Sequence, residues 1–272
     1  VIGISVYVAF AFVLHRLLFE KIKNITMSAN RIIWRNLMLF IFIFCLTGIL
    51  SNSEENFKRE ALLMSRYKKG DVEGALKVGY KSLDASHELT SMRAYVMAKN
   101  GLLGERLFEY PQLYGSAGLL PGLKQTSALL PDSVYTLIGC KPAKNENAVD
   151  FLKRAAHTDS VGKVAREYYL NALLLDKRLP EFKDELAALY GDYKADNLPK
   201  HYREALLLVS RFDKDFKLEL SSDTLYKKFD KLREIESGYD EPIVRNNYVR
   251  KEFGRTYWWY YLYMQLSHSR PD

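Results

Sequence analysis

The sequence predicts an all-α protein, with two N-terminal transmembrane helices followed by a helical solenoid. Three observations lead to this fold class. An uncharged, apolar run occupies residues 36–53. Apolar residues then recur at spacings of three and four through the rest of the chain, and Gly and Pro stand mostly at the expected ends of helices. The alternating pattern that is typical of strands is nearly missing, so we expect helices throughout.

The strongest membrane signal covers about residues 34–52. A bilayer core about 30 Å thick is crossed by about 20 apolar helical residues. This run, rich in Leu, Ile and Phe, is close to that length; Arg31 and Arg35 flank its start, and Glu54 and Glu55 follow its end. We therefore predict a transmembrane helix here.

An apolar stretch also opens the chain, and the predicted first span covers about residues 1–19. Its uncharged part, Val1 to Leu14, would be about 21 Å long at about 1.5 Å per residue, which is too short to cross a bilayer. We therefore expect a truncated span, in a chain that is the C-terminal piece of a longer multi-pass protein. A signal peptide is the alternative, but the basic residues follow the apolar stretch instead of preceding it.

The loop between the two predicted spans, residues 20–33, is short and basic. Because basic loops favour the cytoplasmic side, we expect this loop inside the cell and the remaining chain outside it. The sequence thus predicts a multi-pass protein of the cytoplasmic (inner) membrane with a periplasmic C-terminal domain, and the lipid bilayer is its first expected partner.

Residues 54–272 are mixed in charge and long enough to bury a sizeable core. The net charge of the whole chain is +7, of which about half comes from the predicted membrane region. The remaining excess is spread among many acidic residues, whereas a nucleic-acid site needs basic residues gathered on one face. We therefore expect no nucleic-acid partner. Cys45 and Cys140 lie in unlike parts of the chain, so no disulfide is predicted.

Helical hairpins are expected in residues 54–103, with helices over 54–69, 72–84 and 88–102. Apolar side chains in each stretch recur on one face, and a Gly-Asp turn separates the first two helices. Helices joined by so short a turn lie antiparallel, so these stretches predict a packed hairpin.

The stretch YKKGDVEGALKVGYKSLDA, residues 67–85, resembles a tetratricopeptide repeat. The likeness lies in Tyr67 before the turn, in the turn itself, and in Ala75, whose small side chain lets two helices approach closely. Gly79 stands where the repeat usually has a large residue, and His87 replaces its closing Pro. The resemblance implies a solenoid of stacked helix pairs, which needs about three copies to bury a core. Any antiparallel helix pair is the alternative interpretation.

The remaining chain divides into a Gly- and Pro-rich irregular region, residues 104–145, and a helical repeat region, residues 146–272. In the second region, Leu-Pro followed by an apolar stripe begins at residues 179 and 198. Pro is accepted in the first turn of a helix, because its missing N–H has no helical partner there. The expected helices are 121–129, 131–138, 146–156, 160–176, 180–193, 199–211, 222–237 and 242–267.

Two further stretches carry a family resemblance: LPKHYREALLL at residues 198–208 and the aromatic ending FGRTYWWYYLY at residues 253–263. With the apolar beginning, they make the chain similar to a family of uncharacterised multi-pass membrane proteins of Bacteroides-type bacteria, in which apolar spans precede a helical tail. The resemblance implies a location and an architecture, and it implies no activity.

Aromatic residues form the candidate binding surface. Those near the C-terminus fit three interpretations: a terminal helix packed into the solenoid, a helix docked at a membrane surface, or a platform that stacks on sugars or holds a peptide. The tyrosines of the hairpin region fit the concave face of a repeat or an ordinary core. The candidates are Tyr67, Tyr80, Tyr95, Tyr257, Trp258, Trp259 and Tyr261.

No catalytic signature is present in the sequence. The five histidines lack metal-ligand spacing, the adjacent carboxylates lie in charged stretches at helix ends, and no phosphate loop occurs. We therefore expect no catalytic residue, metal or cofactor, and lean away from an enzyme. The expected function is protein or peptide binding, or scaffolding, at the cell envelope, because helical solenoids expose extended concave surfaces. The alternative is an accessory domain of a multi-pass membrane transferase that resembles a glycosyltransferase.

Overall fold

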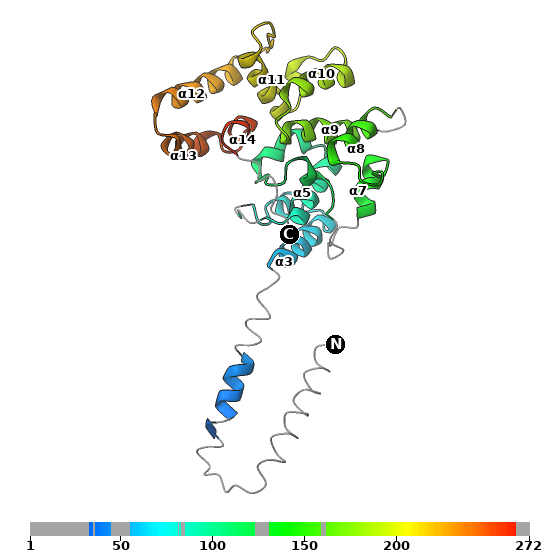
Figure 1. The fold of residues 1–272 in the computed structure, drawn as a ribbon, viewed down its shortest axis with the longest axis vertical. Coiled ribbons are helices and arrows are strands. Elements are labelled where there is room, and N and C mark those ends of the chain that lie inside the picture. Colours follow the sequence, from blue (N-terminus) through cyan, green and yellow to red (C-terminus); the bar gives the residue numbers. More distant parts are fainter. Residues whose placement is uncertain are drawn as a thin grey trace. The chain divides into compact units, whose positions relative to one another are not determined.

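The computed structural model describes residues 33–34, 36–44, 55–80, 82, 85–122, 131–158 and 162–264 (Figure 1). The chain divides into two compact units, Val1–Glu54 and Glu55–Asp272. Each unit is described by itself below.

In the first unit, the described residues are helical and their apolar side chains are exposed. Within the described part of the chain, no helix combines the length and the apolar character needed to span a bilayer. This finding contradicts the two predicted transmembrane helices, and with them the multi-pass placement in the inner membrane and the periplasmic domain. The predicted span 1–19, the loop 20–32 and residues 45–52 lie outside the described residues.

In the second unit, every regular element that the structure describes is helical, which confirms the all-α prediction for these residues. The first half contains α3 (Glu55–Lys68), α4 (Val72–Leu76), α5 (His87–Lys99), α6 (Leu103–Arg106), η2 (Leu107–Glu109), η3 (Gly115–Leu119), α7 (Pro131–Ile138) and α8 (Ala148–Ala156). The second half contains α9 (Lys163–Leu175), α10 (Leu179–Tyr190), η4 (Ala195–Asn197), α11 (Lys200–Phe212), α12 (Thr224–Gly238), α13 (Pro242–Phe253) and α14 (Tyr257–Tyr263).

Short polar side chains begin several of these helices. The side chains of Ser86, Asn147 and Thr256 accept backbone N–H groups in the first turns of α5, α8 and α14. Such caps satisfy N–H groups that have no partner within the helix. The helix starts are therefore fixed locally by the sequence.

Two predicted helices are interrupted in the structure, and most of the helix expected over 121–129 lies outside the described residues. The helix expected over 72–84 ends at Leu76, because Gly79 adopts a left-handed backbone conformation with φ of 63°. The helix expected over 242–267 is divided, since α13 ends at Phe253 and the Thr256 cap begins α14 in a new direction (Figure 1). Both breaks shorten a helix that apolar periodicity alone extends too far.

Helix α9 forms the centre of the second unit. It packs against α5, α6, α7, α8, α10 and η3, and its residues from Tyr168 to Leu175 are all buried. A helix that is buried all round belongs to the interior of a domain. Within α9, Asn171 donates to the hydroxyl of Tyr202 on α11 over 3.0 Å, which joins the centre to the C-terminal helices.

The C-terminal helices continue from this centre. α14 packs against α11, α13 packs against α14, and α12 packs against both α13 and α11 (Figure 1). Helix α6 also approaches α11 closely, because Gly104 has no side chain: a Cβ there would lie 2.8 Å from Cβ of Pro199. This packing leaves a space between α6, α11 and α12, which is the candidate site.

Candidate functional site

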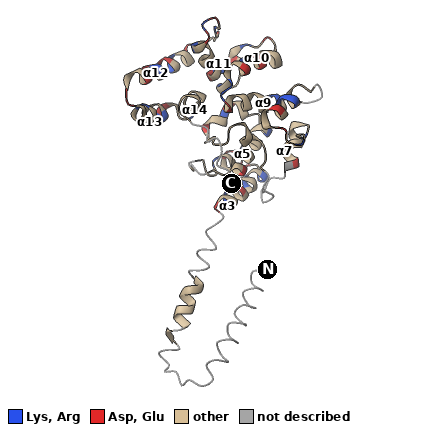
Figure 2. Ribbon diagram, in the orientation of Figure 1, with Lys and Arg blue, Asp and Glu red and all other residues tan. Residues whose placement is uncertain are grey.

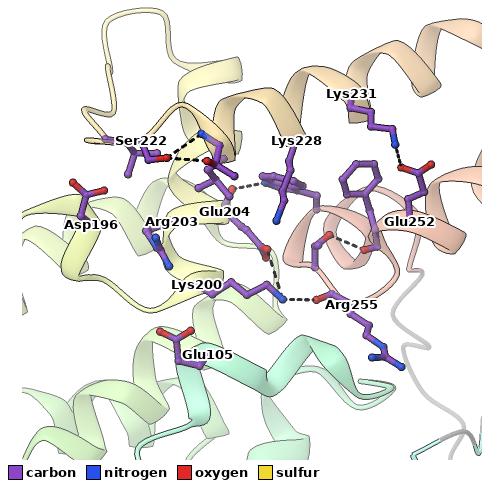
Figure 3. Close-up of a pocket in the computed structure, with 16 residues that line it drawn as sticks. Glu105, Asp196, Lys200, Arg203, Glu204, Ser222, Lys228, Lys231, Glu252 and Arg255 are labelled. Atoms are coloured by element: carbon purple, nitrogen blue, oxygen red, sulfur yellow. Dashed lines mark hydrogen bonds and ion pairs between the residues drawn. The ribbon is translucent and has the colours of Figure 1, made fainter.

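A cavity with a volume of about 650 Å³ lies between α11 and α12 (Figure 3). We call it the α11–α12 pocket. Residues from α6, η4, α13 and α14 complete its wall. The lining residues are Glu105, Asp196, Lys200, Arg203, Glu204, Leu220, Ser222, Thr224, Leu225, Lys228, Lys231, Glu252, Phe253, Arg255, Thr256 and Trp258.

The floor of the pocket is apolar and rigid. Trp258 is fully buried, and its indole Nε1 donates to the backbone oxygen of Glu204 over 2.8 Å. The rings of Phe229 and Phe253 pack on the indole, with centroids 5.2 Å and 5.9 Å away. Because its N–H is satisfied and its ring is enclosed, Trp258 holds α14 against α11 and α12.

The Glu204 side chain stabilises the same packing of α14 on α11, through hydrogen bonds. Its Oε2 accepts the backbone N–H of Tyr257 and a hydrogen bond with Nδ1 of His201, each over 2.8 Å. Glu204 and His201 are 2% and 0% exposed. Buried carboxylates are tolerated when donors surround them. This carboxylate therefore has a structural role, because its Oε2 atom is already engaged by two groups of the protein.

Several charged groups on the rim are also committed to protein partners. Lys231 forms an ion pair with Glu252 over 2.6 Å. Lys200 Nζ donates to the backbone oxygen of Arg255 over 3.0 Å. Asp196 accepts the backbone N–H and the hydroxyl of Ser221, and these hydrogen bonds lower the pKa of its carboxyl group. These groups shape the rim and are not open to a ligand.

Four charged side chains of the pocket form no ion pair within 4.0 Å among the described residues: Arg203, Lys228, Arg255 and Glu105. Arg203 nevertheless lies close enough to Asp196 for its positive charge to help lower the pKa of that carboxyl group. In Figure 3, Arg203 from α11, Lys228 from α12 and Glu105 from α6 point into the space between the helices, whereas Arg255 points away from them. The Nε atom of Arg203 is buried and has no hydrogen-bond partner. Buried polar atoms are usually satisfied, so this atom is notable.

Known catalytic arrangements do not account for the pocket. Among the described residues, no group of three or more His, Cys, Asp or Glu side chains could hold a metal ion. His201 is enclosed behind the floor, with its Nδ1 bonded to Glu204. A general base must reach the proton that it removes, and this imidazole does not reach the pocket.

The aromatic residues predicted as a binding surface fall into two groups. In the hairpin region, the rings of Tyr67 and Tyr95 meet edge to face at 6.3 Å, and Tyr80 is 36% exposed. Tyr95 is nearly buried in the core. The first group therefore combines one exposed ring with two that pack on each other.

The second group belongs to α14. Tyr257 and Trp258 are fully buried, and the ring of Tyr261 lies 5.9 Å from that of Tyr257. Trp259 is half-buried, and its Nε1 donates to Asn246 over 2.9 Å. Only Trp258 lines the pocket.

The sequence contains no visible signal for the pocket cations. Arg203, Lys228 and Arg255 follow one another at intervals of 25 and 27 residues and stand among many other basic residues. Figure 2 shows both basic and acidic residues on α9, α10 and α12, so neither sign marks one of these helices. Only the packing of α11 and α12 shows which charges are left without partners.

Comparison with known proteins gives one family match. Neither a curated protein nor a solved structure matches the chain. Residues 140–264, which contain α8 to α14 and every lining residue of the pocket except Glu105, match a family of unknown function, DUF6057.

Proposed function

We propose that this protein binds a segment of a partner protein in the α11–α12 pocket and acts as a binding or scaffolding module. The observation that supports this proposal is the composition of the pocket: an apolar floor surrounded by charged side chains, several of which lack partners. Pockets for small molecules are mostly apolar, with a few polar groups. Nine of the lining side chains here are charged, which suits a peptide chain that carries both polar and apolar groups.

The helical architecture also supports the proposal. Stacked helices expose grooves on a fixed frame, and Trp258 and Glu204 hold the frame of this pocket. The likeness of residues 67–85 to a tetratricopeptide repeat points in the same direction, although α4 is shorter than the helix of such a repeat. The family match supplies no activity that competes with binding.

A selection from a random peptide library displayed on phage tests the proposal. Peptides selected on the full chain are measured against Thr224→Trp, in which a large ring at the start of α12 fills the pocket. Lys227→Trp is the matched control, because Lys227 is exposed on the same helix and does not line the pocket. We expect Thr224→Trp alone to abolish binding. Peptides that bind both variants equally, or a selection that enriches none, would refute the proposal.

A further inference from the structure

We infer that the pocket selects an acidic peptide segment, with a carboxylate held between Arg203 and Lys228. This inference rests on the proposed function and names the ligand's chemistry. It follows from a comparison of the lining charges that already have partners within the protein with the lining charges that have none.

The formal charges of the lining almost cancel. Five lining residues are Lys or Arg and four are Asp or Glu, so the net charge is only +1. Three of the four carboxylates, however, already accept hydrogen bonds or ion pairs from the protein: Asp196, Glu204 and Glu252. Only Glu105 remains without such a partner among the described residues.

The cations divide differently. Lys231 is paired with Glu252, and Lys200 is held by the backbone oxygen of Arg255. Arg203 and Lys228 remain inside the pocket, and Arg255 remains at its rim with its side chain pointing outward, whereas Glu105 is the one carboxylate of the lining without a partner among the described residues. The side chains available for new contacts therefore favour a negatively charged ligand. The net formal charge of the whole lining, +1, favours such a ligand only slightly.

Arg203 is the best anchor. Its guanidinium points into the space between the helices, and the arginine fork matches a carboxylate with two parallel N–H groups (Figure 3). Lys228 reaches the same space from the opposite helix (Figure 3). A carboxylate between them would meet both cations.

The rest of the wall fits a peptide better than a free anion. Leu220, Leu225 and Phe253 offer apolar surface beside the cations, which an inorganic anion would leave uncovered. Glu105 lies on the opposite wall, where it can accept a backbone N–H from an extended chain. Arg255 points away from the space between the helices, so it can meet a second acidic side chain only where the peptide leaves the pocket. A peptide with acidic and apolar residues in alternation uses all four features.

The peptides obtained from the selection on the full chain test this inference through their charge and through one pair of variants. Lys228→Glu reverses a pocket charge, and Lys227→Glu makes the same change at the next residue, outside the lining. We expect acidic peptides to be enriched. We expect Lys228→Glu to weaken their binding by about tenfold or more, and Lys227→Glu by less than about twofold.

Three further measurements sharpen the result. Peptides with Gln and Asn in place of Glu and Asp should lose binding. A peptide with Lys at the critical position should recover affinity for Lys228→Glu. Added salt should weaken binding, because partly exposed charges are screened. Inorganic phosphate and free glutamate serve as competitors and should not displace the peptide at equal concentration.

The outcomes separate the two proposals. Neutral or basic peptides that are blocked by Thr224→Trp would refute the acidic ligand and leave the binding function standing. Equal effects of Lys228→Glu and Lys227→Glu, or full displacement by phosphate at equal concentration, would also refute the acidic segment. A selection without any peptide sensitive to Thr224→Trp would refute both.

Discussion

The backbone N–H of Tyr257 donates to Glu204 Oε2 over 2.8 Å, which joins the first residue of α14 to α11 across 53 residues of sequence. The same oxygen pairs with His201 Nδ1 over 2.8 Å. One carboxylate therefore satisfies two buried donors and holds the floor of the α11–α12 pocket in place. The strength of this junction can be measured directly.

Replacement of Glu204 by Ala should lower the free energy of unfolding by about 3 kcal/mol, because it leaves two buried donors without an acceptor. Urea unfolding followed by circular dichroism measures the change. Glu219→Ala, at an exposed position, is the control and should change stability by less than about 0.5 kcal/mol. A loss below about 1 kcal/mol for Glu204→Ala would contradict the structural role of this carboxylate.

Lys177 gives a second prediction. It follows α9 with φ of 58°, and its Nζ donates to the backbone oxygens of Tyr261 and Met264 over 2.9 Å and 2.5 Å. Lys177→Met should cost about 2 kcal/mol, because charged hydrogen bonds to the end of α14 are lost. Lys177→Gly loses the same bonds but relieves the left-handed conformation, so it should be about 1 kcal/mol more stable than Lys177→Met. If Lys177→Met and Lys177→Gly are equally stable in urea unfolding, the left-handed conformation of residue 177 does not lower the free energy of unfolding.

Two glycines should respond in opposite ways to the same substitution. At Gly104, a Cβ would lie 2.8 Å from Cβ of Pro199, and the rigid Pro cannot move aside easily. Gly104→Ala should therefore destabilise the protein by about 1–3 kcal/mol. At Gly238, at the end of α12, a Cβ would meet no atom within 4 Å, so Gly238→Ala should stabilise the helix by up to about 1 kcal/mol. Thermal unfolding of both variants checks the signs, and a stabilised Gly104→Ala would show that α6 and α11 do not pack as described.

Alkaline pH should unfold the protein through its buried tyrosines. Burial raises the pKa of Tyr190 to about 12, and it raises the pKa values of Tyr202 and Tyr257 well above the ordinary value of 10.0. Because the folded state holds these protons more tightly, their contribution to stability is complete below pH 10 and is lost as pH rises above it. Burial lowers the pKa of Arg93 to about 10, which acts in the opposite direction, but the raised tyrosines outnumber it.

Stability measured in urea at increasing pH should therefore fall above pH 10, together with the rise of tyrosinate absorbance. Tyr257→Phe is an informative variant, because the buried hydroxyl of Tyr257 has no hydrogen-bond partner. At neutral pH this variant should be as stable as the wild type or slightly more so, and it should lose less stability above pH 10. An identical pH dependence would show that Tyr257 ionises without unfolding.

The helices of the second unit were largely predictable, because their signals are local. The Leu-Pro starts near residues 179 and 198 and the apolar stripes that follow them predicted α10 and α11 closely. Helix ends were harder to predict. Gly79 ends a helix only because its φ is positive, and the turn before Thr256 depends on how α14 packs on Glu204.

The membrane prediction is contradicted. The apolar run 36–53 predicts a span from composition, whereas no helix among the described residues is long and apolar enough to cross a bilayer. The pocket could not be predicted at all. Arg203 and Lys228 matter because Glu204 and Glu252 have other partners, and such pairing exists only after the chain has folded.

The position of Phe108 bears on how the protein can be divided. This buried ring lies before the matched segment 140–264, yet its centroid is 5.0 Å from His201, 4.9 Å from Tyr257 and 4.8 Å from Tyr260. A fragment cut at residue 140 would lose this ring and expose the aromatic side chains around it to water. The matched segment therefore lacks part of its own aromatic packing, and a truncation or domain fusion is better placed at the boundary between the two compact units, before α3.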